Sequence, residues 1–124
     1  GGNVETFKPQ EVGQVISSRS ANTVAAMLVS VVEKGHGKRA GVPGYYVAGK
    51  TGTAQVVRED QPGYDPDLSI GTFAGFAPVE DPKFVIVVKI DNPKIVRFAE
   101  STAAPVFGEL ARFLLNHFQI RPSR

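Results

Sequence analysis

Cysteine and tryptophan are both absent from this chain of 124 residues, and methionine occurs only once. Without cysteine, the chain has neither disulfides nor a cysteine-based zinc site. It also lacks any apolar run close to the about 20 residues that a membrane-spanning helix needs. Residues 1–4 have neither the basic nor the apolar part of a secretion signal, so we expect no signal peptide here. The length suits one domain, or part of one.

Charge of one sign is also scarce, because 14 lysines and arginines nearly balance 12 acidic residues. The net charge of +2 is too small and scattered for a nucleic-acid-binding surface, so we expect no nucleic-acid partner. His36 and His117 each lack a second ligand at metal spacing, and the acidic loop around Asp65 lacks the glycine and closing glutamate of a calcium loop. We therefore expect neither a metal nor a cofactor.

Hydrophobic spacing predicts helices at both ends of a group of strands. The first helix starts at the capping serines of residues 17–20 and ends at Gly35. Residues 35–44 and 58–68 are rich in glycine, proline and polar residues and predict loops. The remaining expected elements are strands at 45–57, 70–77 and 84–91, a short strand at 12–16 and a last helix over about 101–118. This order indicates an α+β fold with helices packed on an antiparallel sheet.

Apolar side chains occupy more than one face of these elements. In the last predicted strand, the even-numbered positions from Phe84 to Ile90 are apolar, and Val85 and Val87 place apolar side chains on the other face. Helices or further chain must therefore cover both faces. The first helix has an apolar stripe made of Val24, Met27, Leu28 and Val31, widened by Ala25, Val29 and Val32.

The stretch from Gly44 to Thr51 matches the phosphate-loop pattern G-x-x-x-x-G-K-[ST]. A phosphate loop needs a buried strand before it and a helix after it, because the helix N-terminus binds the phosphates. Here a glycine-rich loop precedes the pattern and the β-prone residues 52–57 follow it. A nucleotide-binding domain is therefore the less favoured interpretation, and a strand at Lys50 would exclude it.

The same stretch contains Lys50-Thr51-Gly52-Thr53, here called the KTGT motif, which includes the K-T-G signature of penicillin-recognising serine enzymes. Lys50 supplies a cation near the nucleophile and the substrate carboxylate. Thr51 and Thr53 are two residues apart on a strand, so their hydroxyls share a face and can bind one carboxylate together. Gly52 lets an acyl substrate lie along the strand edge, and a backbone N–H just after it can point at a developing oxyanion.

The segments around this motif add a resemblance that covers about residues 9–122. Class B penicillin-binding proteins have similar sequences around their third motif, in the strand and hairpin turn that follow it, and at the start of their last helix. The matching segments here are Val42–Gln55, Thr72–Pro78, Asp81–Lys83 and Ala103–Phe107. The resemblance implies the C-terminal part of the penicillin-binding and β-lactamase-like transpeptidase fold, extending over residues 1–124.

That resemblance also implies a function. It makes the chain part of a serine-type D,D-transpeptidase that cross-links peptidoglycan stem peptides and is acylated by β-lactams. Lys50 would be the catalytic third-motif lysine, Thr51, Gly52 and Thr53 would contact the substrate, and the Thr53 backbone N–H would form half of the oxyanion hole. The implied location is the extracytoplasmic face of the bacterial plasma membrane, with an anchor outside this chain. Division or elongation complexes would supply further partners.

The sequence departs from the family pattern at the nucleophile. No serine is followed three residues later by lysine, so S-x-x-K is missing. Ser20-Ala21-Asn22 matches S-x-N, but it lies too near Lys50 for the second motif, and we interpret it as part of a helix cap. The remaining N-terminal part of the domain must supply the nucleophile, and we expect this chain alone to be inactive. A catalytically dead binding module of the same fold is the alternative.

Overall fold

The computed structural model describes residues 2–95 and 98–124. Two helices enclose three strands in chain order, with two short 3₁₀ turns between them. The elements are α1 (Ser18–Lys34), η1 (Lys38–Ala40), β1 (Ala48–Val57), β2 (Tyr64–Ala77), β3 (Phe84–Asp91), η2 (Ala99–Ser101) and α2 (Ala103–His117). The predicted α+β class and antiparallel sheet are confirmed. Neither helix of the described part is long and apolar enough to cross a membrane.

The strands form one antiparallel sheet in the order β1-β2-β3. Lys50 lies opposite Ala74, and Ala74 in turn lies opposite Val87. Since β2 is the middle strand, β1 and β3 are the two edges of the sheet in the described part of the chain. The KTGT motif therefore lies on an edge strand.

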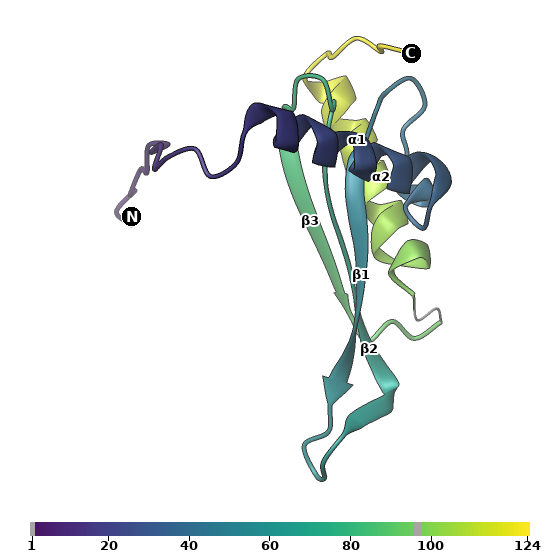
Figure 1. Ribbon diagram of the computed structural model, residues 1–124. Helices are drawn as coiled ribbons and strands as arrows, with labels where there is room; N and C mark the ends of the chain where they lie inside the picture. The colour runs from purple at the N-terminus through teal and green to yellow at the C-terminus, as the bar shows by residue number, and fades with distance from the viewer. Residues whose placement is uncertain (1, 96–97) are drawn as a thin grey trace.

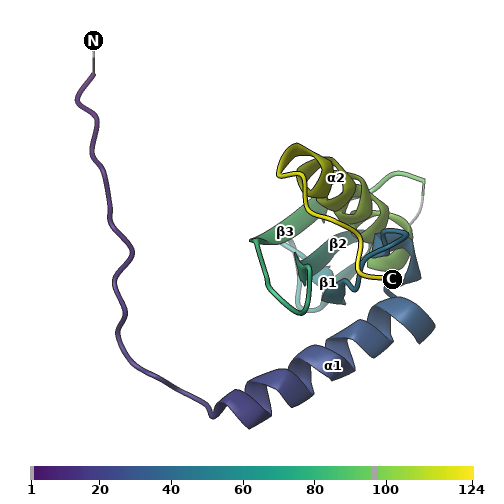
Figure 2. The same cartoon turned by 90° about the horizontal axis from the view of Figure 1, so that it is seen from above.

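The two helices cover the sheet unequally. Figures 1 and 2 show α2 lying along one face, whereas α1 crosses the opposite face at one end only. The face under α2 holds most of the core, including Phe73 and Val88. On the other face, Val85 and Val87 are 73% and 67% exposed. Within the described residues, α2 therefore covers one face of the sheet, and most of the opposite face has no helix over it.

Two glycines allow α2 to approach the sheet closely. Gly49 and Gly75 lie opposite each other on β1 and β2. A Cβ atom on Gly75 would lie 2.8 Å from the ring of Phe107, and one on Gly49 would lie 2.5 Å from the ring of Phe73. The two rings pack together with centroids 4.7 Å apart, and both are fully buried. This aromatic pair is the centre of the core.

The C-terminal residues 120–124 hold the segment that leads into β1. The Tyr45 hydroxyl donates to the carbonyl of Ile120 at 2.5 Å. The backbone N–H of Ser123 donates to the carbonyl of Gly44 at 3.0 Å. The Arg124 guanidinium binds the Glu33 carboxylate at 2.5 Å, which raises the pKa of Arg124. The strand β1 begins after this segment, at Ala48 rather than at residue 45 as predicted.

Two further predictions about local structure are wrong. Residues 12–16 form no strand, because no partner strand pairs with them in the described part, and Val12 is 96% exposed. The predicted loop at 58–68 is too long, because β2 begins at Tyr64. Pro66 falls where the register shifts, and such irregularities tolerate proline. The first helix lies where it was predicted, and within its apolar stripe Val24 and Met27 are exposed.

We expect Phe107→Ala to lower the free energy of unfolding by about 3–5 kcal/mol, because it removes a fully buried ring and leaves a cavity. Phe113→Ala is the matched control, since Phe113 lies on the same helix but is 63% exposed. The Phe113→Ala control is expected to lower the free energy of unfolding by about 0.5 kcal/mol. Urea unfolding followed by circular dichroism measures both, and equal losses would contradict the assignment of the core.

Candidate functional site

Lys50 lies inside β1, and the strand continues without a break to Val57. No helix follows Thr51, so the backbone N–H groups that a phosphate loop provides at a helix N-terminus are missing here. The phosphate-loop interpretation is therefore wrong.

The two threonines of the motif line one cavity, as their spacing predicts. This cavity has a volume of about 310 Å³ and is called the threonine pocket below. Besides Thr51 and Thr53, its lining consists of His36, Phe98, Ala99 and Glu100. Two hydroxyls thus face the same space, beside the ring of Phe98 and the side chains of His36 and Glu100.

A contact with η2 orients the second threonine. The buried backbone N–H of Ala99 donates to Oγ1 of Thr53 at 3.4 Å. The turn itself lies close against β2, because a Cβ atom on Gly71 would lie 2.8 Å from Oγ1 of Thr102. A larger residue at position 71 would push this turn away from the sheet. Because Thr53 accepts in this contact, its hydroxyl hydrogen can still be donated to a ligand.

Lys50 belongs to the opposite face, because successive side chains of a strand alternate. Its ammonium group donates to the carbonyl of Thr51 at 2.9 Å and to Oγ1 of Thr51 at 3.3 Å. The side chain is exposed and does not line the threonine pocket. The structure thus brings Thr51 and Thr53 together and places the cation beside the first of them.

Gly52 has a contact that sequence reasoning missed. A Cβ atom there would lie 2.6 Å from Oγ1 of Thr72, and this hydroxyl donates to the carbonyl of Gly52 at 3.2 Å. A larger residue at position 52 would therefore displace the Thr72 hydroxyl of the neighbouring strand.

His36 and Glu100 were also missed as parts of this site. The Nδ1 atom of His36 lies 2.5 Å from Oε2 of Glu100. The two residues are 64 positions apart, so no local spacing indicated their contact. Within residues 2–95 and 98–124, no group of three histidine or acidic side chains is placed to hold a metal ion. Ser17, by contrast, caps α1 as expected, accepting from the N–H of Ser20 at 3.1 Å.

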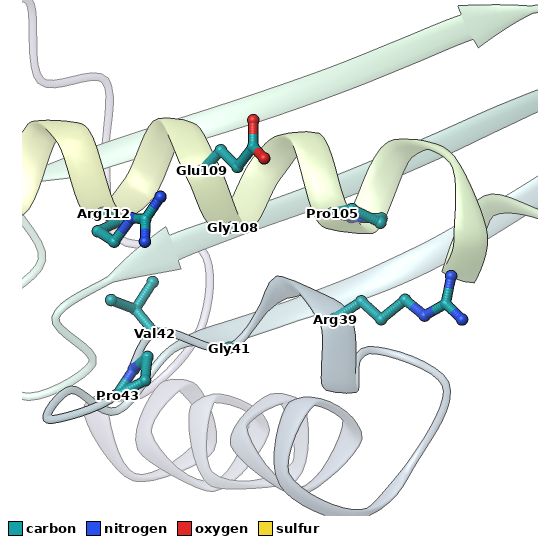
Figure 3. Close-up of a pocket in the computed structure, with 8 residues that line it drawn as sticks. All are labelled: Arg39, Gly41, Val42, Pro43, Pro105, Gly108, Glu109 and Arg112. Atoms are coloured by element: carbon teal, nitrogen blue, oxygen red, sulfur yellow. The ribbon is translucent and has the colours of Figure 1, made fainter.

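A larger cavity, of about 430 Å³, lies between η1 and α2 (Figure 3). Its lining includes Arg39, Pro105 and Arg112, and Figure 3 shows Glu109 pointing away from Val42. No residue of the KTGT motif lines it. The candidate site therefore remains the smaller threonine pocket.

Comparisons with known proteins agree with the resemblance found in the sequence. The model of the family described as penicillin binding protein transpeptidase domain matches residues 4–112. Stage V sporulation protein D of Bacillus subtilis is 41% identical over 122 residues, which are 98% of this chain and 19% of that protein. The penicillin-binding protein PbpB of Mycobacterium tuberculosis is 38% identical over 93% of this chain and 18% of its own length.

Solved structures give the same result. Penicillin binding protein 3 of Mycobacterium tuberculosis, complexed with ampicillin, matches with a TM-score of 0.83 and 36% identity, over 99% of this chain and 29% of that one. The transpeptidase domain of Burkholderia pseudomallei penicillin-binding protein 3 matches with a TM-score of 0.83 and 32% identity, over 98% and 37%. The chain thus spans about a fifth of the curated relatives cited above, and it belongs to the penicillin-binding protein transpeptidase domain family.

Proposed function

We propose that this chain is the third-motif part of a serine D,D-transpeptidase domain that cross-links peptidoglycan stem peptides and is acylated by β-lactams. The observation that carries the proposal is the pair of hydroxyls, Thr51 and Thr53, that line one pocket on an edge strand beside the Lys50 ammonium group. Penicillin binding protein 3 of Mycobacterium tuberculosis, a solved relative, has structures complexed with ampicillin and with aztreonam.

The threonine pair fits the recognition of a carboxylate, which both stem peptides and penicillins carry. A carboxylate accepts several hydrogen bonds at once, and each bond to a charged group contributes about 1.5–3 kcal/mol. Thr53 is already oriented by the N–H of Ala99, so little conformational entropy is lost when it donates. The pocket therefore anchors one end of the substrate.

The free edge of β1 suits the rest of the peptide. An edge strand presents unpaired N–H and C=O groups, and an extended peptide can add to them as a further strand. In this arrangement the Thr53 N–H becomes one donor of the oxyanion hole, and such a donor contributes about 100-fold to 1,000-fold in rate. The Lys50 ammonium group stabilises negative charge near the same end of the strand.

The nucleophile must come from residues outside this chain, because S-x-x-K is absent from the sequence. Uncovered apolar side chains fit a partner of this kind. Val85 and Val87 share the face of Lys50, and Met27 on α1 is also exposed. We therefore assign this chain to the C-terminal portion of the domain and propose that the N-terminal remainder covers this face. Division or elongation complexes are the proposed wider partners, at the extracytoplasmic face of the plasma membrane.

The alternative is a catalytically dead binding module of the same fold. It shares the carboxylate pocket but performs no acyl transfer. Acylation by a β-lactam separates the two functions, because only an active domain forms the covalent adduct.

We expect labelled benzylpenicillin to acylate a domain assembled from this chain and a polypeptide carrying the remaining transpeptidase residues. Denaturing mass spectrometry should find the label on the S-x-x-K serine and none on this chain. Label on neither polypeptide would favour the dead module. A covalent adduct on this chain alone would contradict the proposed division of roles.

Replacing Lys50 by alanine should lower the acylation rate of that assembled domain by about 100-fold or more, because the charge stabilisation beside the reacting group is lost. Lys83→Ala is the matched control, since Lys83 is paired with Asp81 in the hairpin turn and does not line the threonine pocket. If the acylation rate of the Lys50→Ala variant stays within about twofold of the wild-type rate, Lys50 takes no part in the reaction.

Thr51→Val and Thr53→Val should each weaken penicillin binding by about 10-fold to 100-fold, because each loses one hydrogen bond to a carboxylate at nearly constant volume. The loss should appear in the concentration dependence of acylation more than in its limiting rate. Thr23→Val, on the exposed surface of α1, is the control. If both pocket variants bind like the control, the carboxylate does not occupy this pocket.

A further inference from the structure

The threonine pocket contains a histidine–glutamate hydrogen bond that the proposed reaction does not use. His36 comes from the turn after α1, and Glu100 comes from η2, immediately before α2. The Nδ1 atom of His36 and Oε2 of Glu100 lie 2.5 Å apart, and both residues line the cavity together with Thr51 and Thr53. The pair thus joins two loops at the place where the substrate carboxylate is proposed to bind.

A free Glu100 would conflict with that role. Its carboxylate and the substrate carboxylate would share one cavity of about 310 Å³, so the two negative charges would repel each other. The glutamate is also restrained in its position. Ala99 beside it is 1% exposed, and the N–H of Ser101 donates to the carbonyl of Phe98 at 2.9 Å, which holds the turn closed.

His36 removes the conflict. An imidazole donates Nδ1–H to a carboxylate in its charged form, and its neutral form can carry the proton on the same nitrogen. In both cases the negative charge of Glu100 is engaged by a donor.

We propose that His36 is a positioning residue of the carboxylate subsite, which acts by masking the charge of Glu100 so that the threonine pocket accepts an anionic group. This inference rests on the proposed function, because it takes a carboxylate to be the group that Thr51 and Thr53 bind. It assigns a purpose to two residues that lie outside the KTGT motif.

The His36–Glu100 contact could serve only to hold the two loops together, or it could offset the negative charge of Glu100, and these two roles predict different effects of substitution. If the pair only holds the two loops together, replacing either residue weakens acylation, and replacing both does not restore it. If His36 masks the charge of Glu100, replacing His36 alone weakens acylation, and neutralising Glu100 as well restores it. The double variant therefore separates the two roles.

The test measures acylation of the assembled transpeptidase domain by labelled benzylpenicillin, which carries one carboxylate. We expect His36→Gln to lower the second-order acylation constant about fivefold, through weaker prior binding and with little change in the limiting rate. Adding Glu100→Gln should restore the constant to within about twofold of the wild type. The deficit of His36→Gln should also shrink at high salt, because the His36 side chain is largely exposed and that of Glu100 is partly exposed.

Lys83→Gln is the matched control, because it opens the Lys83–Asp81 pair outside the pocket and should change the constant less than twofold. Thermal unfolding of each variant checks that the fold is intact. An unlabelled wild-type domain would overturn the proposed function itself. A labelled wild type with an unaffected His36→Gln variant, or a deficit that the double variant fails to repair, would overturn this inference alone.

Discussion

The close approach of α2 to the sheet is the constraint on which the site depends. Phe107 reaches Phe73 only because Gly75 and Gly49 present no side chains beneath the two rings. This packing fixes where α2 begins, and therefore where η2 lies against β2. The N–H of Ala99 then meets the Thr53 hydroxyl. A core interaction thus sets the orientation of a group at the edge of the sheet.

The edge strand divides its chemistry between two faces. Thr51 and Thr53 point to the α2 side and line a pocket, while Lys50 belongs to the opposite side, which α1 covers at one end only. That second side also exposes Val85 and Val87. This surface, which combines a cation with uncovered apolar residues, is the one that we propose the remainder of the domain covers, because burying the valines would stabilise the assembly.

Where the sequence patterns failed, the missing information was tertiary. Residues 12–16 have the composition of a strand, but a strand needs a partner, and none pairs with them in the described part. The start of β2 at Tyr64 was missed because Pro66 suggested a loop, whereas a register shift accommodates it. On α1, the stripe was correctly placed in the helix, but packing leaves Met27 exposed.

The sequence by itself determined the antiparallel sheet, both helices and the shared face of Thr51 and Thr53, because these follow from local periodicity and from the two-residue repeat of a strand. Only the tertiary structure decided the contact of Ala99 with Thr53 and that of Glu100 with His36. These partners are 46 and 64 positions apart, and no periodic pattern links them. They meet because glycine-dependent packing of α2 places η2 against the motif at Thr53.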